Sequence, residues 1–393
     1  MTKRVQALRT RPRAVGIALA LAMVLLPAVV AAPSARAQTF TDLYNFTGGA
    51  DGADPWAGVV LDAADNIYGT TMFGGSSGYG TVFKMDSSGN ETVLHSFAGT
   101  DGAEPWAGVI RDANGNIYGT TMWGGCCKDG TVFKLDPSGK QTVLHSFTGG
   151  TTDGCNPTMG LVQDKLGNLY GATQACGSSS WGTIFKLDQK GNETVLYSFT
   201  GGTDGENPNY GSLFMDKNGN LYGVTSGGGL YDEGVVYKLS KSGKETVLHT
   251  FAGGETDGCY PYGSVTMDHA GNLYGTTVEC GTYGGGVVWK VSERGKETLL
   301  HSLYCPDGCA PSAGVVLGTD GNLYGDNETG GSSNDGTIFK LTAKGKITVL
   351  HTFSGSDGKS PVGGVVLDKK GNLYGAATFG GSYDYGTVFK LTP

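Results

Sequence analysis

The sequence predicts an all-β fold, a seven-bladed β-propeller of four-stranded antiparallel blades, and three observations lead to this prediction. The phrase Asn-Ile/Leu-Tyr-Gly occurs seven times between Asn66 and Gly375, at spacings of 50 or 52 residues. Each repeat contains four short runs of strand-forming residues separated by Gly, Asp, Asn and Ser. One strand of the last repeat is found at the other end of the repeat array. Regular repetition at this period is typical of propellers and solenoids.

The first repeat illustrates the four expected strands, here named A to D, which cover residues 57–62, 66–73, 80–86 and 91–97. The A-to-B turns are variants of Asp-x-x-Gly-Asn, and the C-to-D turns contain phrases such as Ser-Gly-Asn. Gly and Asn tolerate the positive φ that a tight hairpin needs. The 69 glycines of the chain leave no long apolar stripe of helical period after residue 37, so no helix is expected there.

The ends of the repeat array indicate how the ring closes. The strand C phrase, such as Gly80 to Lys84, occurs seven times, whereas the strand D phrase follows only six of these copies. The missing copy is Phe40 to Phe46, which aligns with Glu91 to Phe97. Pairing the two ends would remove the exposed edges of an open array. We therefore expect the N-terminal strand to complete the last blade, with an open β-solenoid as the alternative.

Residues 1–37 differ from the rest and are predicted to be a signal peptide. Basic residues precede the apolar run Ala14 to Ala32, and Ala35-Arg36-Ala37 resembles a cleavage site. A membrane span is the alternative, but Pro27 interrupts the run. Residues 38–393 are then expected to form one propeller domain that is secreted to the extracellular space or the periplasm.

The net charge excludes one class of partner. Loss of the six basic residues in the leader leaves 22 Lys and Arg against 36 Asp and Glu, a net charge of about −14. A chain of this charge does not favour the phosphate backbone, so no nucleic-acid or heparin-like partner is expected. No second apolar run of spanning length occurs, and the mature chain is expected to be a monomer without a membrane span.

Three phrases in fixed order resemble the GloVer (Gloeo/Verruco-type) tandem-repeat proteins of bacteria. They are Asp-x-x-Gly-Asn-Leu-Tyr-Gly, Gly-Thr-Val-Phe-Lys and Glu-Thr-Val-Leu-His-Ser-Phe, and the resemblance covers Phe40 to Pro393. Such proteins are extracellular and often carry a C-terminal anchoring segment, which is not seen in this sequence. The resemblance implies secretion without attachment, and it supplies no catalytic residues.

Two repeated polar positions are interpreted as structural. Five histidines occupy one position of strand D, where two other blades have Tyr44 and Tyr197, so the position requires a ring with a polar tip. Asp-Gly-x-x-Pro recurs seven times, and an Asp before Gly commonly bonds nearby backbone N–H groups. No cofactor is expected, with calcium at these aspartates as the alternative. The residues are His95, His145, His249, His301 and His351, and Asp51, Asp101, Asp153, Asp204, Asp257, Asp307 and Asp357.

The eight cysteines are predicted to form disulfides, as is usual in exported proteins. Cys155–Cys176 and Cys259–Cys280 share one spacing and one pair of repeat positions, and each pair would join the loop entering strand A to the end of strand B. The close pair Cys305 and Cys309 would bracket a small loop. For the adjacent Cys126 and Cys127 we expect a strained vicinal disulfide, with zinc or redox chemistry as alternatives.

Function is expected where the copies differ, which is in the D-to-A and B-to-C loops on one face, here named the top face. Aromatic rings concentrate in these loops and suit stacking on sugars or packing on a protein; the alternative is that they cover neighbouring blades. The candidate binding residues are Trp56, Trp106, Trp123, Trp181, Tyr210, Tyr231, Tyr262, Tyr283 and Tyr383.

The top loops also contain acidic residues that are the candidates for catalysis. Blade six has Asp326 and Glu328 where other blades have uncharged residues, and blade five has Glu279. A glycoside hydrolase would need two such carboxylates facing one pocket. The sequence therefore predicts a secreted module that binds a glycan or a protein. The alternatives are a carbohydrate-active enzyme, as a glycoside hydrolase before a polysaccharide lyase, and a purely structural extracellular module.

Overall fold

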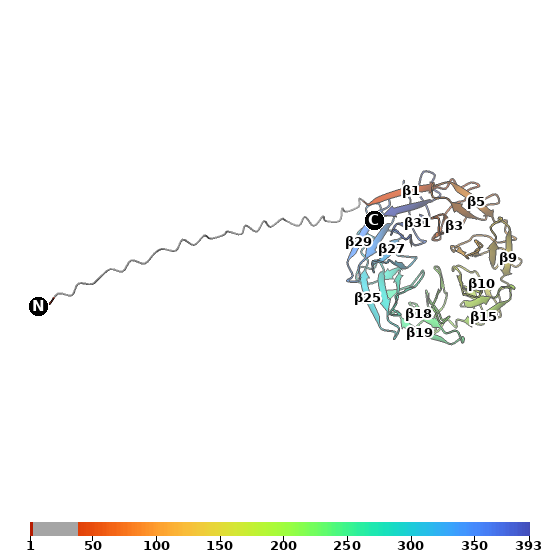
Figure 1. Ribbon diagram of the computed structural model, residues 1–393. Helices are drawn as coiled ribbons and strands as arrows, with labels where there is room; N and C mark the ends of the chain where they lie inside the picture. The colour runs from red at the N-terminus through yellow and green to blue at the C-terminus, as the bar shows by residue number, and fades with distance from the viewer. Residues whose placement is uncertain (3–37) are drawn as a thin grey trace. The chain divides into compact units, whose positions relative to one another are not determined.

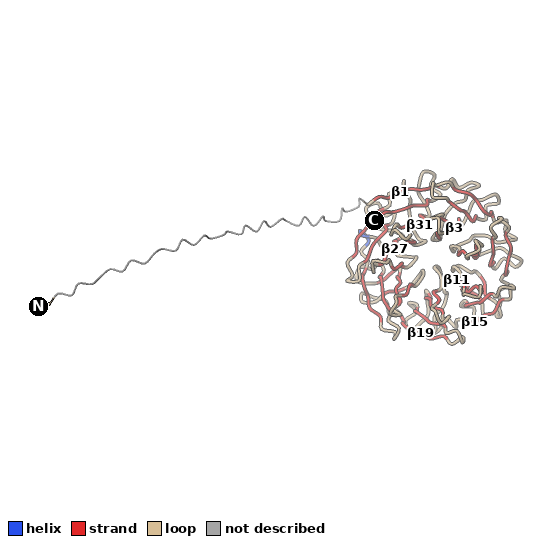
Figure 2. Tube along the Cα trace, viewed as in Figure 1, coloured by secondary structure: helices blue, strands red, loops and turns tan. Residues whose placement is uncertain are grey.

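The computed structural model describes residues 1–2 and 38–393, so the predicted signal peptide lies almost entirely outside the described residues. Residues 38–393 form one compact unit in which seven four-stranded antiparallel sheets are arranged as blades around a ring (Figure 1). The predicted seven-bladed propeller is therefore confirmed. Figure 2 shows that strands and loops build this ring, and the one helix among the described residues is the short 3-10 helix η1 (Cys305–Asp307).

Each blade runs from an inner strand at the ring axis to an outer strand at the rim. Blade one contains β2 (Val60–Leu61), β3 (Ile67–Thr71), β4 (Thr81–Met85) and β5 (Glu91–Ser96). Blade two contains β6 (Ile110–Arg111), β7 (Ile117–Thr121), β8 (Thr131–Leu135) and β9 (Gln141–Ser146). Blade three contains β11 (Val162–Gln163), β12 (Leu169–Thr173), β14 (Thr183–Leu187) and β15 (Glu193–Ser198). Blade four contains β16 (Phe214–Met215), β17 (Leu221–Thr225), β18 (Val235–Leu239) and β19 (Glu245–Thr250).

The later blades follow the same order, and the last one uses both ends of the array. Blade five contains β21 (Thr266–Met267), β22 (Leu273–Thr277), β24 (Val287–Val291) and β25 (Glu297–Ser302). Blade six contains β26 (Val315–Leu317), β27 (Leu323–Asn327), β28 (Thr337–Leu341) and β29 (Ile347–Thr352). Blade seven contains β30 (Val366–Leu367), β31 (Leu373–Ala377), β32 (Thr387–Thr392) and β1 (Thr39–Asn45).

The N-terminal strand closes the ring as expected. In Figure 1, β1 lies beside the C-terminal end of the chain, and it pairs with β32 from Thr39↔Thr392 to Asn45↔Thr387. The ring of Phe40 stacks on His351 of blade six, with centroids 3.7 Å apart. Phe46 is fully buried and packs on Phe83 of blade one. The first strand thus joins blade seven to both of its neighbours.

The repeated phrases are explained by hydrogen bonds within each blade. In blade one the carboxylate of Asp62 accepts hydrogen bonds from the backbone and side chain of Asn66 and from the hydroxyl of Tyr68. The Nζ of Lys84 lies 5.9 Å from the centre of the Tyr68 ring, within the range of a cation–π contact. A Cβ on Gly69 would come within 2.6 Å of the Phe83 ring, so only glycine fits there. The phrase Asp-x-x-Gly-Asn-Leu-Tyr-Gly is therefore a structural signature.

The hydrophobic core lies between adjacent blades. In six blades an aromatic residue after the outer strand contacts the strand C aromatic of the next blade, as in Phe97 with Phe133 at 5.1 Å and Phe251 with Trp289 at 5.7 Å. Blade five has the buried Leu303 at this position. Each buried cluster combines side chains from neighbouring blades. Because every blade needs its neighbours to bury these rings, ring closure and core formation are coupled.

The strand D histidines and the Asp-Gly aspartates are paired with each other. Nε2 of His95 lies 2.9 Å from the carboxylate of Asp101, and the hydroxyl of Tyr197 donates to Asp204 at 2.8 Å in the equivalent place. The same carboxylates accept backbone N–H bonds, for example from Ala98 to Asp101. Blade five differs, since Nδ1 of His301 lies 3.2 Å from the carbonyl oxygen of Gly345. The structural interpretation of both positions is thereby supported.

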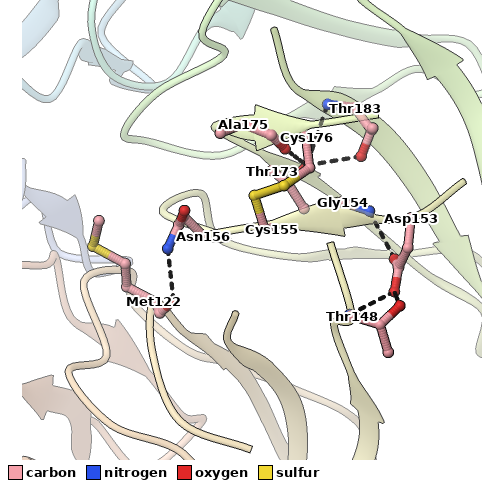
Figure 3. Close-up of a disulfide and its surroundings, with 10 residues drawn as sticks. All are labelled: Met122, Thr148, Asp153, Gly154, Cys155, Asn156, Thr173, Ala175, Cys176 and Thr183. Atoms are coloured by element: carbon pink, nitrogen blue, oxygen red, sulfur yellow. Dashed lines mark hydrogen bonds between the residues drawn. A yellow bond between two sulfur atoms is a disulfide. The ribbon is translucent and has the colours of Figure 1, made fainter. Parts of the chain in front are cut away.

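Three disulfides are formed, and they match the expected pairs. Cys155–Cys176 and Cys259–Cys280 each join a two-stranded ribbon on the top face, with Cα atoms 5.4 and 5.5 Å apart. The ribbons are β10 (Gly154–Cys155) with β13 (Ala175–Cys176), and β20 (Gly258–Cys259) with β23 (Glu279–Cys280). Figure 3 shows the first bridge beside Asp153, whose carboxylate accepts N–H bonds from Thr148 and Gly154. Cys305–Cys309 closes the third loop.

The expected vicinal disulfide is absent. Cys126 and Cys127 are free and exposed, with their sulfur atoms 3.0 Å apart, which is longer than a bonded pair. Bonding adjacent cysteines would close a small ring and distort the intervening peptide, whereas this exposed loop leaves both side chains free to turn outward. The thiol of Cys127 has a raised pKa, chiefly because of its contact with Cys126.

Candidate functional site

The candidate site lies at the ring axis and is built from one repeat position. This position follows the proline of each Asp-Gly-x-x-Pro motif, directly in six blades and after one extra residue, Asn209, in blade four. In the seven blades it is occupied by Trp56, Trp106, Thr158, Tyr210, Tyr262, Ser312 and Val362. Because the motif ends where the chain turns from the top loop toward the inner strand, equivalent residues meet around the axis. All of them except Thr158 line one pocket of about 300 Å³.

The aromatic members form a connected arc around part of the pocket. The rings of Trp56 and Trp106 are 5.2 Å apart, and those of Tyr210 and Tyr262 are 5.1 Å apart. Trp106 and Tyr210 are 6.0 Å apart and join the two pairs across blade three. There the smaller Thr158 donates a hydrogen bond to the side chain of Asn209 instead of projecting an aromatic ring. The buried indole Nε1 of Trp106 has no hydrogen-bond partner.

The other side of the pocket is polar and comes from blade six. The hydroxyl of Ser312 donates to a carboxylate oxygen of Glu328 at 3.0 Å. Glu328 follows β27 and is partly buried. Its carboxylate is also one cause of the raised pKa of the Tyr210 phenol, after burial and the charge of Tyr262. Glu328 and the aromatic arc therefore face the same pocket.

The pocket wall below these side chains is made of closely packed backbone. A Cβ on Gly58 would meet the carbonyl oxygen of Gly363 at 2.4 Å, so the inner segments of blades seven and one touch only because both carry glycine. The N–H of Gly160 donates to Gly211 at 2.7 Å, which links blades three and four. Small and aliphatic residues such as Ser264 and Val366 complete the lining. This wall is rigid and offers few polar side chains.

Strand A is shorter than the sequence predicts, and the pocket explains the difference. Residues 57–62 were expected to form a full strand, but β2 contains only Val60–Leu61. The residues before it, Ala57 to Val59, line the pocket and contact the inner segments of neighbouring blades. Residues 57–59, the part of the predicted strand nearest the axis, therefore line the pocket instead of pairing with β3 of their own blade.

The three acidic candidates are separated by the structure. Only Glu328 lines the pocket. Asp326 is fully buried behind the wall, where its carboxylate accepts the N–H of Gly364 at 3.0 Å and its other oxygen has no partner. Burial raises the pKa of Asp326 to about 7. Glu279 is exposed in β23, outside the pocket. The structure does not bring two of these carboxylates to one pocket surface.

Five of the predicted binding residues lie outside the pocket. Their side chains are exposed in the B-to-C loops, and none of them lines the pocket. Tyr283 contacts Tyr304, with ring centroids 5.3 Å apart, and Trp181 lies against Gly201 in the adjoining loop. The five are Trp123, Trp181, Tyr231, Tyr283 and Tyr383. Of the predicted binding residues, the four that line the pocket are Trp56, Trp106, Tyr210 and Tyr262.

The polar pocket residue Ser312 is not among the candidates predicted from the sequence. Its signal was available, because Ser312 occupies the same repeat position as Trp56. A serine has neither the aromatic ring nor the carboxylate that marks the other candidate residues. Asp326 was named, but its burial was not predictable because it depends on the approach of Gly364 from the next blade.

A second acidic set occurs at the rim, far along the blades from the axis. Glu91, Glu193, Glu245 and Glu297 begin the outer strands of blades one, three, four and five. Burial raises the pKa of each from 4.5 to about 7, and an Asp-Gly carboxylate nearby adds to the rise. One oxygen of each has no partner. Blade two has Gln141 there, whose Nε2 donates to the carbonyl oxygen of Asp101 at 3.2 Å.

Within residues 1–2 and 38–393, no group of three or more His, Cys, Asp or Glu side chains is arranged to hold a metal ion. The repeated aspartates instead bond backbone N–H groups and the strand D rings. Calcium binding at these residues stays an untested alternative. The same described residues contain no helix of the length and apolarity needed to cross a membrane.

The blades and the axial pocket define a repeat propeller with a ligand-sized cavity at its axis. The chain belongs to the Gloeobacter/Verrucomicrobia repeat family, whose model matches residues 32–229 and 209–393. This finding confirms the resemblance seen in the repeated phrases. No curated protein matches the chain.

Solved structures share the architecture at low sequence identity. Virginiamycin B lyase from Staphylococcus aureus has a TM-score of 0.60 and 12% identity, covering 91% of this chain and 99% of that one. A streptogramin B lyase has a TM-score of 0.62 and 13% identity, covering 90% and 97%. The extracellular domain of a candidate hybrid two-component system from B. thetaiotaomicron has a TM-score of 0.58 and 10% identity, covering 89% and 39%. At these identities the likeness shows the fold alone.

Proposed function

We propose that this protein is a secreted binding module whose axial pocket holds one sugar unit of an extracellular glycan. The observation that carries the proposal is the arc of Trp56, Trp106, Tyr210 and Tyr262 facing the polar pair Ser312 and Glu328. Flat rings accept the apolar C–H faces of a sugar, while the hydroxyl and carboxylate accept or donate hydrogen bonds at its polar edge. The fold requires the same residues in every blade, so it does not explain why one side of the pocket is aromatic and the other side is polar.

The size of the pocket favours a glycan over a protein surface. A volume of about 300 Å³ accommodates a small ligand or the end of a chain. A protein partner would need a much broader buried surface than one pocket supplies. The three disulfides support secretion, since such bonds persist in oxidising compartments. The extracellular domain among the structurally similar proteins points the same way.

The enzyme alternative is weaker on geometry. Glycoside hydrolysis ordinarily uses two carboxylates that flank the scissile bond. Glu328 is the one carboxylate residue that lines the described pocket, and Asp326 lies behind the wall with a bond to Gly364. A turnover assay with each glycan that binds would detect hydrolysis and overturn the assignment as a binding module.

The test is a glycan panel read by tryptophan fluorescence and calorimetry on the mature protein. Trp56→Ala and Trp106→Ala should each weaken binding by roughly tenfold or more, because each removes a ring of the pocket. Trp181→Ala is the matched control, since this exposed tryptophan lies outside the pocket. Equal binding by all three variants would contradict the axial site. So would the absence of any binding glycan across a broad panel.

A further inference from the structure

We infer that the pocket prefers an amino sugar whose amine is free and protonated, an inference that rests on the proposed glycan-binding function. The ammonium would lie against the Glu328 carboxylate while the sugar ring faces Trp56 and Trp106. This goes beyond sugar binding because it specifies the charge of the sugar.

The charge of the pocket is the first observation. Among the described residues that line it, Glu328 is the one Asp or Glu, and no Lys, Arg or His is present. No ion pair within 4.0 Å involves Glu328 in the described part of the chain, and its hydrogen-bonded side-chain partner is the neutral hydroxyl of Ser312. A partly buried carboxylate without a cation gains most from a ligand that supplies one.

The repeat itself shows that the fold does not require this charge. The position of Glu328 is occupied in the other six blades by Met72, Met122, Gln174, Ser226, Val278 and Thr378. All six are uncharged, and their blades adopt the same four-stranded form. The carboxylate is therefore particular to the blade whose Ser312 also departs from the aromatic pattern.

The aromatic arc complements a cation as well as a sugar face. The π faces of Trp and Tyr carry negative potential and attract ammonium groups. A uronic acid would instead place its carboxylate in a pocket that contains Glu328 and no basic side chain. A neutral sugar would desolvate Glu328 without supplying a counter-charge. An ammonium is the group that satisfies the carboxylate and the rings together.

The buried indole N–H of Trp106 argues for a hydroxylated cation instead of a simple alkylammonium. This donor has no partner in the structure and is shielded from solvent. Because this donor is already desolvated in the free protein, a sugar hydroxyl or ring oxygen that reaches it from the pocket would gain a hydrogen bond without a further desolvation cost to the indole. A tetraalkylammonium ion has no acceptor to offer. An amino sugar offers both an acceptor for the Trp106 N–H and a cation for the Glu328 carboxylate.

The experiment compares two trisaccharides that differ only in N-acetylation. The β-1,4-linked trimer of glucosamine and that of N-acetylglucosamine are titrated into the mature protein at pH 6 and physiological salt, with tetramethylammonium as a third probe. We expect the free amine to bind roughly tenfold or more tightly than the acetylated trimer, as suits a charge-assisted hydrogen bond. Tetramethylammonium should bind more weakly than the glucosamine trimer.

Glu328→Gln supplies the decisive variant. It should abolish the preference for the free amine while leaving the affinity for the acetylated trimer nearly unchanged. Glu279→Gln, which removes an exposed carboxylate outside the pocket, should keep the preference and so controls for the overall negative charge. A preference that survives Glu328→Gln, or falls equally in Glu279→Gln, would overturn the inference.

The remaining outcomes separate this inference from the proposed function. Equal binding of the two trimers, or binding only of an uncharged glycan, would refute the amino-sugar preference and leave glycan binding intact. Tetramethylammonium binding as tightly as the glucosamine trimer would show that a cation suffices and would also refute it. Binding of no glycan at all would refute both.

Discussion

Replacing the four rim glutamates by glutamine should stabilise the protein at alkaline pH. The variant is Glu91→Gln, Glu193→Gln, Glu245→Gln and Glu297→Gln, which introduces the residue that blade two already has at Gln141. Folding raises the pKa of each glutamate from 4.5 to about 7. Each glutamate therefore binds a proton more tightly in the folded chain. The stability that each glutamate contributes to the folded state is therefore fully present below pH 4.5 and is lost as the pH rises through 7.

The magnitude follows from this rise in pKa after allowance for solvent. A fully buried group with this rise would lose roughly 3 kcal/mol, but these side chains are only half-buried, and screening reduces the effect to roughly 1 kcal/mol each. The four sites lie in different blades and should add, which gives roughly 4 kcal/mol between pH 5 and pH 8. Asp326 and Asp54, whose pKa values are raised to about 7 and about 6, keep a smaller dependence in the variant.

The assay is urea unfolding of the wild-type protein and the variant at pH 5 and pH 8. The wild-type protein should lose stability between these values, whereas the variant should show a much flatter dependence and exceed the wild type at pH 8. Each single variant should contribute about a quarter of the effect. Parallel pH dependences in the two proteins, or a variant that is less stable at pH 8, would refute the assignment of these glutamates as the source.

Further predictions concern closure, cysteine pairing and the buried acid. Deleting Thr39 to Phe46 should expose β32 and cause aggregation or loss of cooperative melting, and an unchanged monomer in chromatography would argue against closure by β1. Non-reducing peptide maps should recover the disulfides Cys155–Cys176 and Cys259–Cys280, and each should stabilise the folded protein by roughly 3 kcal/mol. Thiol titration of the unreduced protein should count two reactive thiols, those of Cys126 and Cys127. Any other count would contradict the pairing. Asp326→Thr, which copies Thr70 of blade one, should raise the urea midpoint at pH 8, and a lower midpoint would show that the acid is needed for folding.

The architecture was predictable because it depends on local phrases that repeat. Asp62, Asn66 and Tyr68 satisfy one another within a single hairpin, and the recurring Asn-Ile/Leu-Tyr-Gly phrase identifies every blade. The displaced copy at Phe40 to Phe46 identified the closing strand by the same logic. The pairing of Cys155 with Cys176 also followed, since both lie at fixed positions of one repeat.

The pocket was predictable only in part because it depends on how blades approach one another. Trp56 and Trp181 both lie in top loops, and only the fold shows that Trp56 turns toward the axis while Trp181 remains exposed. The raised pKa of Glu193 arises in the same way. The outer strand of blade three brings it beside Asp153, a contact between loop and strand that the strand pattern does not reveal.

Closure by β1 imposes an order on biosynthesis. The strand Thr39–Asn45 is among the first parts of the propeller to be synthesised, and its partner β32 is the last strand to be completed. Phe40 and Phe46 therefore cannot reach their places in blade seven until β32 has been made. A propeller with this topology stays open while its blades are synthesised, and it closes only after its last strand is complete. Delayed closure of this kind would suit the secretion proposed above, because an exported polypeptide crosses the membrane before it folds.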